Sequence, residues 1–237
     1  MAGCDTVAQS FQATPEAPIV WQAGMEGGHM GEWYAPGGHR TGGGEFNSDG
    51  GESFASMDVA HGGAWSAALV LPGGSGGTRL FRWRESDEHP EAYYAAWFYF
   101  PRRYEPDVWW SIFQFKSQLS ELVSDPFWVL TVDNRDDGAM YLELGDARTD
   151  RAYPQEVADL PVGAWVHIEC YLRQSATADG QLKCWQDGQL LWDLEGITTH
   201  HPGSTNQWSV NNYSDAVGPA PVVVYVDDAS ISVPADP

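Results

Sequence analysis

The amide of Gln114 and the amine of Lys116 lie two residues apart in an apolar segment that covers residues 109–117. This segment predicts a β-strand, in which side chains alternate between the two faces of a sheet. Trp110 and Ile112 then share a face with the amide and the amine. The opposite face holds Trp109, Ser111, Phe113, Phe115 and Ser117. An aromatic ring beside hydrogen-bonding groups is typical of a sheet that binds or cleaves a sugar polymer, so this strand is the first candidate for the floor of a groove.

The charges of the chain are unevenly placed. The formal net charge is −21, which argues against general nucleic-acid binding because phosphates would be repelled. This excess of carboxylates indicates either solubility and adaptation to salt or acid, or cation binding at one or two acidic sites. Six of the 12 Lys and Arg residues nevertheless fall in one central stretch: Arg79, Arg82, Arg84, Arg102, Arg103 and Lys116. A groove in this basic segment can accept an acidic polysaccharide.

Short strands are the elements that must position these residues. Gly (26) and Pro (15) are frequent and spread along the chain, as expected where turns join many strands. The predicted strands include residues 53–59 with 64–71, 78–84, 91–100, 127–134 with 140–144, 165–173 with 182–185, 208–213 and 221–232. Such a series predicts an all-β fold of two antiparallel sheets packed face to face. We expect residues 1–18 to form a flexible leader and residues 19–237 a single domain, which acts as a monomer.

The three cysteines bear on the compartment. A hairpin centred near Thr177 would place Cys170 opposite Cys184, where either a cross-strand disulfide or two buried free thiols can occur. The start Met1-Ala2-Gly3-Cys4 resembles the end of a bacterial lipoprotein signal, and an unrelated cysteine in a flexible start is the alternative. From the start of the chain and the possible disulfide we expect an extracytoplasmic protein, secreted or lipid-anchored. No run of 18 apolar residues exists to span a membrane.

Four segments together resemble the concanavalin A-like jelly roll of lectins, glucanases and polysaccharide lyases. They are residues 21–28 with Trp33, residues 59–69, residues 161–168 and residues 224–229. The resemblance covers most of residues 19–233 and implies a two-sheet jelly-roll sandwich. It carries little information about function, because one fold hosts many activities.

Within that fold, the chain is most similar to the heparin lyase I and glucuronan lyase group. Those enzymes carry an Arg on a strand after a Gly-rich loop, a Gln-x-His strand and a Tyr on a late strand. Residues 76–85 stand at the first place, Gln114-Phe115-Lys116 at the second and residues 208–213 at the third. Lys116 replaces the histidine that the group often has, so the identity of the base stays open.

The resemblance implies a chemistry for these residues. A lyase neutralises the uronate carboxylate, removes the proton at C5 and protonates the leaving O4. Lys116 is either the base or a cation that holds the carboxylate, and Tyr213 is either the acid or both acid and base. Gln114, Arg84 and Asn134 would complete the catalytic set. The expected substrate contacts are Arg82, Trp110 and Asn211.

Calcium is the cofactor that this resemblance implies. In many jelly rolls Ca²⁺ ties the first strand to the last through one carboxylate from each. Glu26 and Asp228 stand at such positions, with Asp227 in place of Asp228 if the register differs, and the alternative is that these acids only cap strand ends. A Cys-x-x-Cys pair and a His-Glu-x-x-His motif are absent from the sequence.

Two functions follow from the sequence. The first is an exported polysaccharide lyase-like protein that cleaves a uronate-containing polymer by β-elimination. The second is a non-catalytic, lectin-like carbohydrate-binding module that uses the same groove, with Trp110, Tyr94 or Trp97 as stacking platforms. A purely structural cell-surface domain is a third interpretation.

Overall fold

The computed structural model describes residues 17–35, 42–120 and 123–235. Two antiparallel sheets form a sandwich, as the sequence predicts. Most of the expected leader, residues 1–16 with Cys4, lies outside the described residues. None of the described helices is long and apolar enough to cross a membrane.

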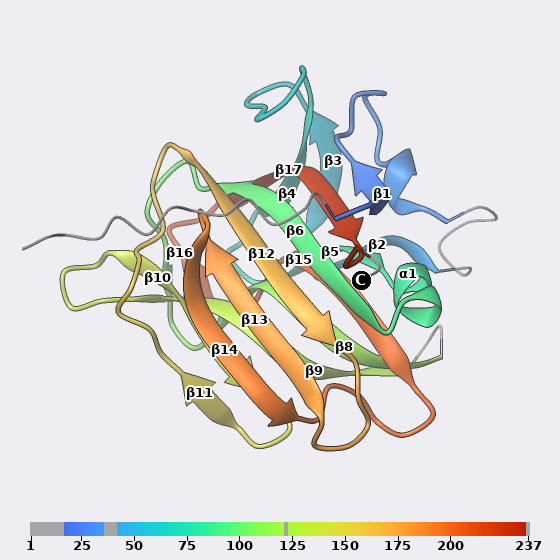
Figure 1. The fold of residues 1–237 in the computed structure, drawn as a ribbon. Coiled ribbons are helices and arrows are strands. Elements are labelled where there is room, and N and C mark those ends of the chain that lie inside the picture. Colours follow the sequence, from blue (N-terminus) through green and yellow to red (C-terminus); the bar gives the residue numbers. More distant parts are fainter. Residues whose placement is uncertain (1–16, 36–41, 121–122, 236–237) are drawn as a thin grey trace, which may run out of the picture.

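The larger sheet has eight strands. In spatial order they are β14 (Gln189–Ile197), β13 (Gly180–Gln186), β12 (Trp165–Arg173), β6 (Glu91–Tyr99), β17 (Val222–Ser232), β4 (Ser66–Leu71) and β3 (Glu52–Ser56), with β1 (Ile19–Ala23) paired to β17. Figure 1 shows β14, β13, β12 and β6 in the nearer layer.

The second sheet has seven strands. Their order is β11 (Arg151–Tyr153), β10 (Met140–Asp146), β9 (Val123–Asn134), β8 (Trp110–Ser120), β15 (Thr205–Ser214), β5 (Gly76–Arg82) and β2 (Gly43–Ser48). A two-stranded sheet, β7 (Glu105–Pro106) with β16 (Val217–Gly218), and two short helices, η1 (Gly31–Trp33) and α1 (Arg84–Glu88), complete the described elements.

The core lies between the two sheets and is rich in aromatic rings. Because side chains alternate along each strand, every second residue points inward. The inward residues include Phe98, Val166 and Val224 from the larger sheet and Phe113, Leu130 and Trp208 from the smaller one. The faces that point away from the core are therefore where functional side chains must lie.

The cysteine hairpin is confirmed. Cys170 on β12 pairs with Cys184 on β13 across the ladder, and the two residues form a disulfide. The alternative of two free thiols is thereby excluded. The bond lies within the larger sheet, away from the strand that carries Gln114 and Lys116.

A β-bulge in β8 overturns the predicted position of Trp110. The pairing of β8 with β9 shifts between Ser111 and Phe113, so that Ile112 is an extra residue and the alternation changes phase there. Trp110 consequently points into the core, where it is fully buried and donates a hydrogen bond to Asn212 (2.9 Å). It cannot line the groove.

Two predicted arginines also lie elsewhere: Arg82 shares the inward face of β5 with Leu80, and Arg84 lies beyond the end of β5. Arg82 points inward from the end of β5 and forms a buried ion pair with Glu85. Arg84 begins the helix α1 and pairs with Glu88 at 3.3 Å on the surface. Neither is available to a polymer on the outer face of the smaller sheet, so the predicted roles of Arg82 and Arg84 do not fit this geometry.

Candidate functional site

The outer face of the seven-stranded sheet carries a line of polar side chains on β5, β15 and β8. We call it the polar row, and its members are Arg79, Ser111, Gln114, Lys116, Asn211 and Tyr213. Strand alternation explains it, because the intervening residues Phe113, Phe115, Trp208 and Val210 all point into the core. Four residues predicted from the sequence are therefore brought together, namely Gln114, Lys116, Asn211 and Tyr213.

Arg79 lies at the centre of the polar row. Its Nε donates to Asn211 Oδ1 (3.1 Å), and Asn211 Nδ2 donates to Ser111 Oγ (3.0 Å). The guanidinium lies between two rings, 5.6 Å from the centroid of Phe46 and 5.4 Å from that of Tyr213. Burial lowers the pKa of Arg79. Asn211 is itself fully buried, so it orients the arginine and does not reach a ligand.

The sequence interpretation missed Arg79 as a site residue, although a signal was present. Leu80 is a core residue by type, and residues at even spacing from it share its face. Arg82 therefore had to point inward with Leu80, and Arg79 outward. Both side chains take these directions.

Gln114 occupies the floor of the polar row opposite Ser209 on β15. Its side chain is about nine-tenths buried, with 6% of the residue exposed. Within the described part of the chain, its Oε1 atom has no hydrogen-bond partner. A buried acceptor without a partner is costly, which indicates a group that is completed by a ligand or by water.

Lys116 lies on the same face of β8, two residues beyond Gln114. Among the described residues, no hydrogen bond or ion pair engages its Nζ atom. Burial, together with the positive charge of Arg79, lowers the pKa of Lys116 to about 8, although Asp125 acts in the opposite direction. A substantial fraction of the amine is therefore neutral in mildly alkaline solution, and neutral amine is the form that accepts a proton.

Tyr213 closes the other end of the polar row. Its ring lies over Gly77 of β5, where a Cβ atom would overlap the ring. The ring of Trp109 lies on its other side, with centroids 5.2 Å apart. Gly77 is thus required for the position of this tyrosine.

Asn134 lies away from the polar row. Its Nδ2 donates to the backbone oxygens of Tyr104 and Gly138, both at 3.1 Å. These bonds hold the β9–β10 turn, and the residue shares the inward face with Val132. The predicted catalytic role of Asn134 therefore finds no support in its position.

The acids expected to bind calcium surround one loop. Both oxygens of Glu26 accept from the backbone of Ala64, and Asp228 contacts His61 Nδ1 at 2.7 Å. Buried Asp227 accepts from the amide of His61 (2.8 Å), and burial raises its pKa to about 6. Across the described ranges, no group of three or more His, Cys, Asp or Glu side chains could hold a metal ion.

A cavity of about 450 Å³ adjoins the polar row. Trp109, Ser111, Gln114 and Tyr213 form its border with the row. The rest of its lining comes from β9, β10 and the start of β11, namely Pro126, Val129, Thr131, Val132, Asp133, Glu143, Gly145, Asp146, Ala147, Asp150, Arg151 and Ala152, with Val108 beside them. A volume of this size suits a small ligand or one unit of a polymer.

Comparisons with known proteins identify the family of the chain and structures that share its fold. The sequence profile of a family described as polysaccharide lyase matches residues 77–230, which is more than half of the chain. No curated protein matches the chain by sequence.

Three solved structures share the fold. An endo-β-1,4-glucuronan lyase from the fungus Trichoderma reesei has a TM-score of 0.64 and 15% identity, with 91% of this chain and 96% of that chain covered. A carbohydrate esterase from a Shiga toxin-encoding bacteriophage has a TM-score of 0.62 and 11% identity, with 92% and 100% covered. An alginate lyase from the marine Aplysia kurodai has a TM-score of 0.61 and 13% identity, also with 92% and 100% covered. At these identities the likeness concerns the fold alone.

Proposed function

Because the chain belongs to the polysaccharide lyase family, we propose that it cleaves a uronate-containing polysaccharide by β-elimination at the polar row. The observation that carries the proposal is the group formed by Arg79, Gln114 and Lys116 on one exposed sheet face. It combines a fixed guanidinium, an unpaired buried amide and an amine of lowered pKa. These are the groups that a uronate elimination requires.

The carboxylate of the uronate binds at the centre of the row. The guanidinium of Arg79, whose Nε is held by Asn211, presents its remaining N–H groups to the carboxylate oxygens. The amide nitrogen of Gln114 adds a neutral donor. Withdrawal of charge from the carboxylate acidifies the proton at C5, which is the first requirement of the reaction.

Proton transfer is assigned to the two ends of the row. Neutral Lys116 accepts the C5 proton, the released electron pair forms the C4–C5 double bond, and the C4–O4 bond breaks while Tyr213 gives its proton to O4. Ser111 pairs with Tyr213, and Lys116 is five residues further along β8, about 16 Å at roughly 3.3 Å per residue. In this scheme both long side chains have to extend toward Gln114, which lies between them, to act on the same sugar unit.

The alternative scheme makes Lys116 a cation that holds the carboxylate and gives both proton transfers to Tyr213. The pH dependence separates the two. If Lys116 is the base, kcat/KM rises as pH increases through about 8, because the neutral form accumulates. If it is a cation, kcat/KM falls over the same range.

The test of the function is an assay for unsaturated products. The protein is incubated with glucuronan, alginate, heparin and pectin, and the ultraviolet absorbance of the new double bond is recorded. We expect product from at least one polymer and a loss of about 10²- to 10⁴-fold in Tyr213→Phe and Lys116→Ala. Arg84→Ala, on the surface of α1, is the matched control.

The lectin-like function is the competing outcome of the same experiment. A binding module would retard in polysaccharide gels without an increase in absorbance from any polymer. Of its expected platforms, Tyr94 is buried in the core and Trp97 lies on the opposite sheet, stacked on His61 at 3.8 Å. A binder would therefore use Trp109 and Tyr213 instead.

Export and calcium belong to the same proposal. The Cys170–Cys184 disulfide supports a location in an oxidising compartment outside the cytoplasm. A protein there can encounter extracellular polysaccharides. Calcium would be held by Glu26 and Asp228 beside the glycine loop at Gly62 and Gly63, although backbone N–H groups already contact Glu26. Thermal unfolding with Ca²⁺ or with chelator tests it: an equal melting temperature in both would remove calcium from the proposal.

A further inference from the structure

The cavity beside the polar row has a charge opposite to that of the row. Its lining includes four carboxylates and one arginine, namely Asp133, Glu143, Asp146, Asp150 and Arg151. Glu143 is opposite Thr131 in the β9–β10 ladder, and Asp133 is opposite Tyr141. The outer face of the sheet therefore changes from cationic at β5 to anionic at β10.

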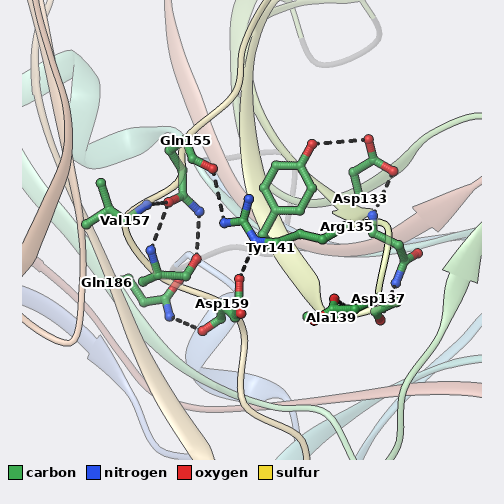
Figure 2. Close-up of polar contacts among 12 residues, drawn as sticks. Asp133, Arg135, Asp137, Ala139, Tyr141, Gln155, Val157, Asp159 and Gln186 are labelled. Carbon is green, nitrogen blue, oxygen red and sulfur yellow. Dashed lines mark hydrogen bonds and ion pairs between the residues drawn. The ribbon is translucent and has the colours of Figure 1, made fainter.

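The nearby cations leave this charge largely uncompensated. Arg135 follows β9 directly, but its Nε donates to Asp159 and its Nη2 to the backbone oxygen of Gln155, as Figure 2 shows. Among the described residues, Asp133 instead accepts from the hydroxyl of Tyr141 at 3.4 Å and from the adjacent backbone N–H of Asn134. Arg135 is thus turned to the segment that precedes β12, and it forms no ion pair with Asp133.

Arg148 and Arg151 also neutralise little of the negative charge of the cavity. Arg148 pairs with Asp146 at 3.2 Å, which accounts for one of the four acids. Arg151 lies over the ring of Tyr153, 4.5 Å from its centroid. Glu143 has no side-chain partner within the described part of the chain, and burial together with Asp133 raises its pKa.

The free groups that face the cavity are mainly hydrogen-bond acceptors. Glu143 and Asp133 offer carboxylate oxygens, and the unpartnered Oε1 of Gln114 lies at the border of the same cavity. Gln114 is an observation independent of the acids, since it is nine-tenths buried and belongs to the floor. A ligand that completes these groups must present hydroxyl or N–H donors, and a carboxylate there would be repelled.

We propose that this cavity binds a sugar unit that has no carboxylate, next to the uronate held by the polar row. The substrate is then a heteropolymer in which uronates alternate with a neutral or amino sugar, and a homopolymer of uronates is disfavoured. Trp109, which lines the cavity, supplies an aromatic face for the ring of that unit. This inference rests on the proposed function, whose reactive centre adjoins the cavity.

The first experiment compares kcat/KM on two kinds of polymer. Glucuronan and alginate contain only uronates, whereas heparosan and hyaluronan alternate a uronate with an N-acetylated amino sugar. The carboxylates of the cavity repel a second uronate and not a sugar without a carboxylate, so we expect at least roughly tenfold higher kcat/KM on the alternating polymers. Higher kcat/KM on the homopolymers would overturn the inference.

Glu143→Gln with Asp133→Asn tests the cause. Removal of both charges should raise kcat/KM on glucuronan about tenfold, mainly through KM, and should not raise it on N-acetylated polymers, whose hydroxyl and N–H donors lose carboxylate acceptors. A polymer with free amino groups should instead lose affinity, which distinguishes an ammonium sugar from a neutral one. Glu169→Gln is the matched control, because Glu169 is also half-buried but lies on the opposite sheet. Equal kcat/KM of wild type and double variant on glucuronan would contradict the inference.

Failure of the proposed function gives a different pattern. If no polymer yields unsaturated ends, catalysis is refuted. Affinity electrophoresis in gels of the same polymers still measures which polymers the protein binds, and so tests the cavity separately. Stronger retardation by alternating polymers, with this preference reduced or lost in the double variant, supports the cavity assignment. Equal retardation by all polymers overturns it.

Discussion

Arg79 and Arg82 are three residues apart on β5, and they show how one residue type serves two purposes. Arg79 points outward, where its partners are the neutral amide of Asn211 and two aromatic rings. Arg82 points inward, where it is paired with the carboxylate of Glu85 and donates to the backbone oxygen of Trp33 (2.9 Å). An arginine whose charge is matched by an acid is a structural element, whereas one held without an acid can bind an anion.

Loss of the inward arginine should have the largest effect. Arg82→Ala leaves Glu85 as an unpaired buried charge, and breaking such a pair typically costs about 3–5 kcal/mol of the free energy of unfolding. Chemical denaturation measures this. Because Arg82→Ala itself can prevent folding, Arg82→Met with Glu85→Leu is the companion variant: it should fold and keep its activity, since an apolar pair replaces the ion pair. An unchanged stability of Arg82→Ala would refute the structural role.

Loss of the outward arginine should affect activity instead. Arg79→Ala removes the principal donor to the uronate carboxylate, and we expect kcat/KM to fall by about 10²- to 10³-fold, with a smaller loss of stability than in Arg82→Ala. Arg79→Lys keeps the charge but not the planar fork, so it should recover only part of the rate. If Arg79→Ala retained full activity while unfolding at much lower denaturant, the two arginines would not differ as described.

The outward arginine also acts on Lys116. Burial is the main cause of the lowered pKa of Lys116, and the charge of Arg79 is the second. In Arg79→Gln we expect this pKa to rise from about 8 toward, but not to, its ordinary value near 10.4. NMR titration of the Lys116 amine measures it. Arg82→Met with Glu85→Leu leaves Arg79 in place and should leave this pKa unchanged, so an equal shift in both would argue against a direct charge effect.

The fold was predictable from the sequence because it depends on local patterns. The hairpin that carries Cys170 and Cys184, and the one around residues 135–138, follow from alternation and turn residues. Gln114 and Lys116 were placed on one face for the same reason. These predictions needed only a strand period of two and the position of the turns, whereas Tyr213 was expected at the site from the family resemblance.

The errors arise where that period changes or where a strand ends. Alternation predicts the face of Trp110 only if β8 is regular, and a bulge is decided by pairing with β9 and β15, which the strand itself does not encode. Arg84 was misplaced because β5 ends at Arg82 and α1 begins at Arg84, whereas the inward direction of Arg82 follows from its even spacing to Leu80. The charge reversal between Arg79 and Glu143 needs the strand order, because these residues lie on strands that are distant in sequence.

Arg84 is the third arginine of the same segment and should show the smallest effect. It lies on the exposed surface of α1, and its contact with Glu88 is 3.3 Å long with 44% and 56% of the two side chains exposed. An exposed pair with this spacing typically contributes about 0.3–0.5 kcal/mol to the free energy of unfolding. Arg84 is not a member of the polar row. Arg84→Ala should therefore change the melting temperature by no more than about 1–2 °C and leave kcat/KM unaltered. A loss of activity in Arg84→Ala, with the fold intact, would show that the basic segment acts on the polymer beyond the sheet face, and the distinction between Arg79 and its neighbours would then be one of degree.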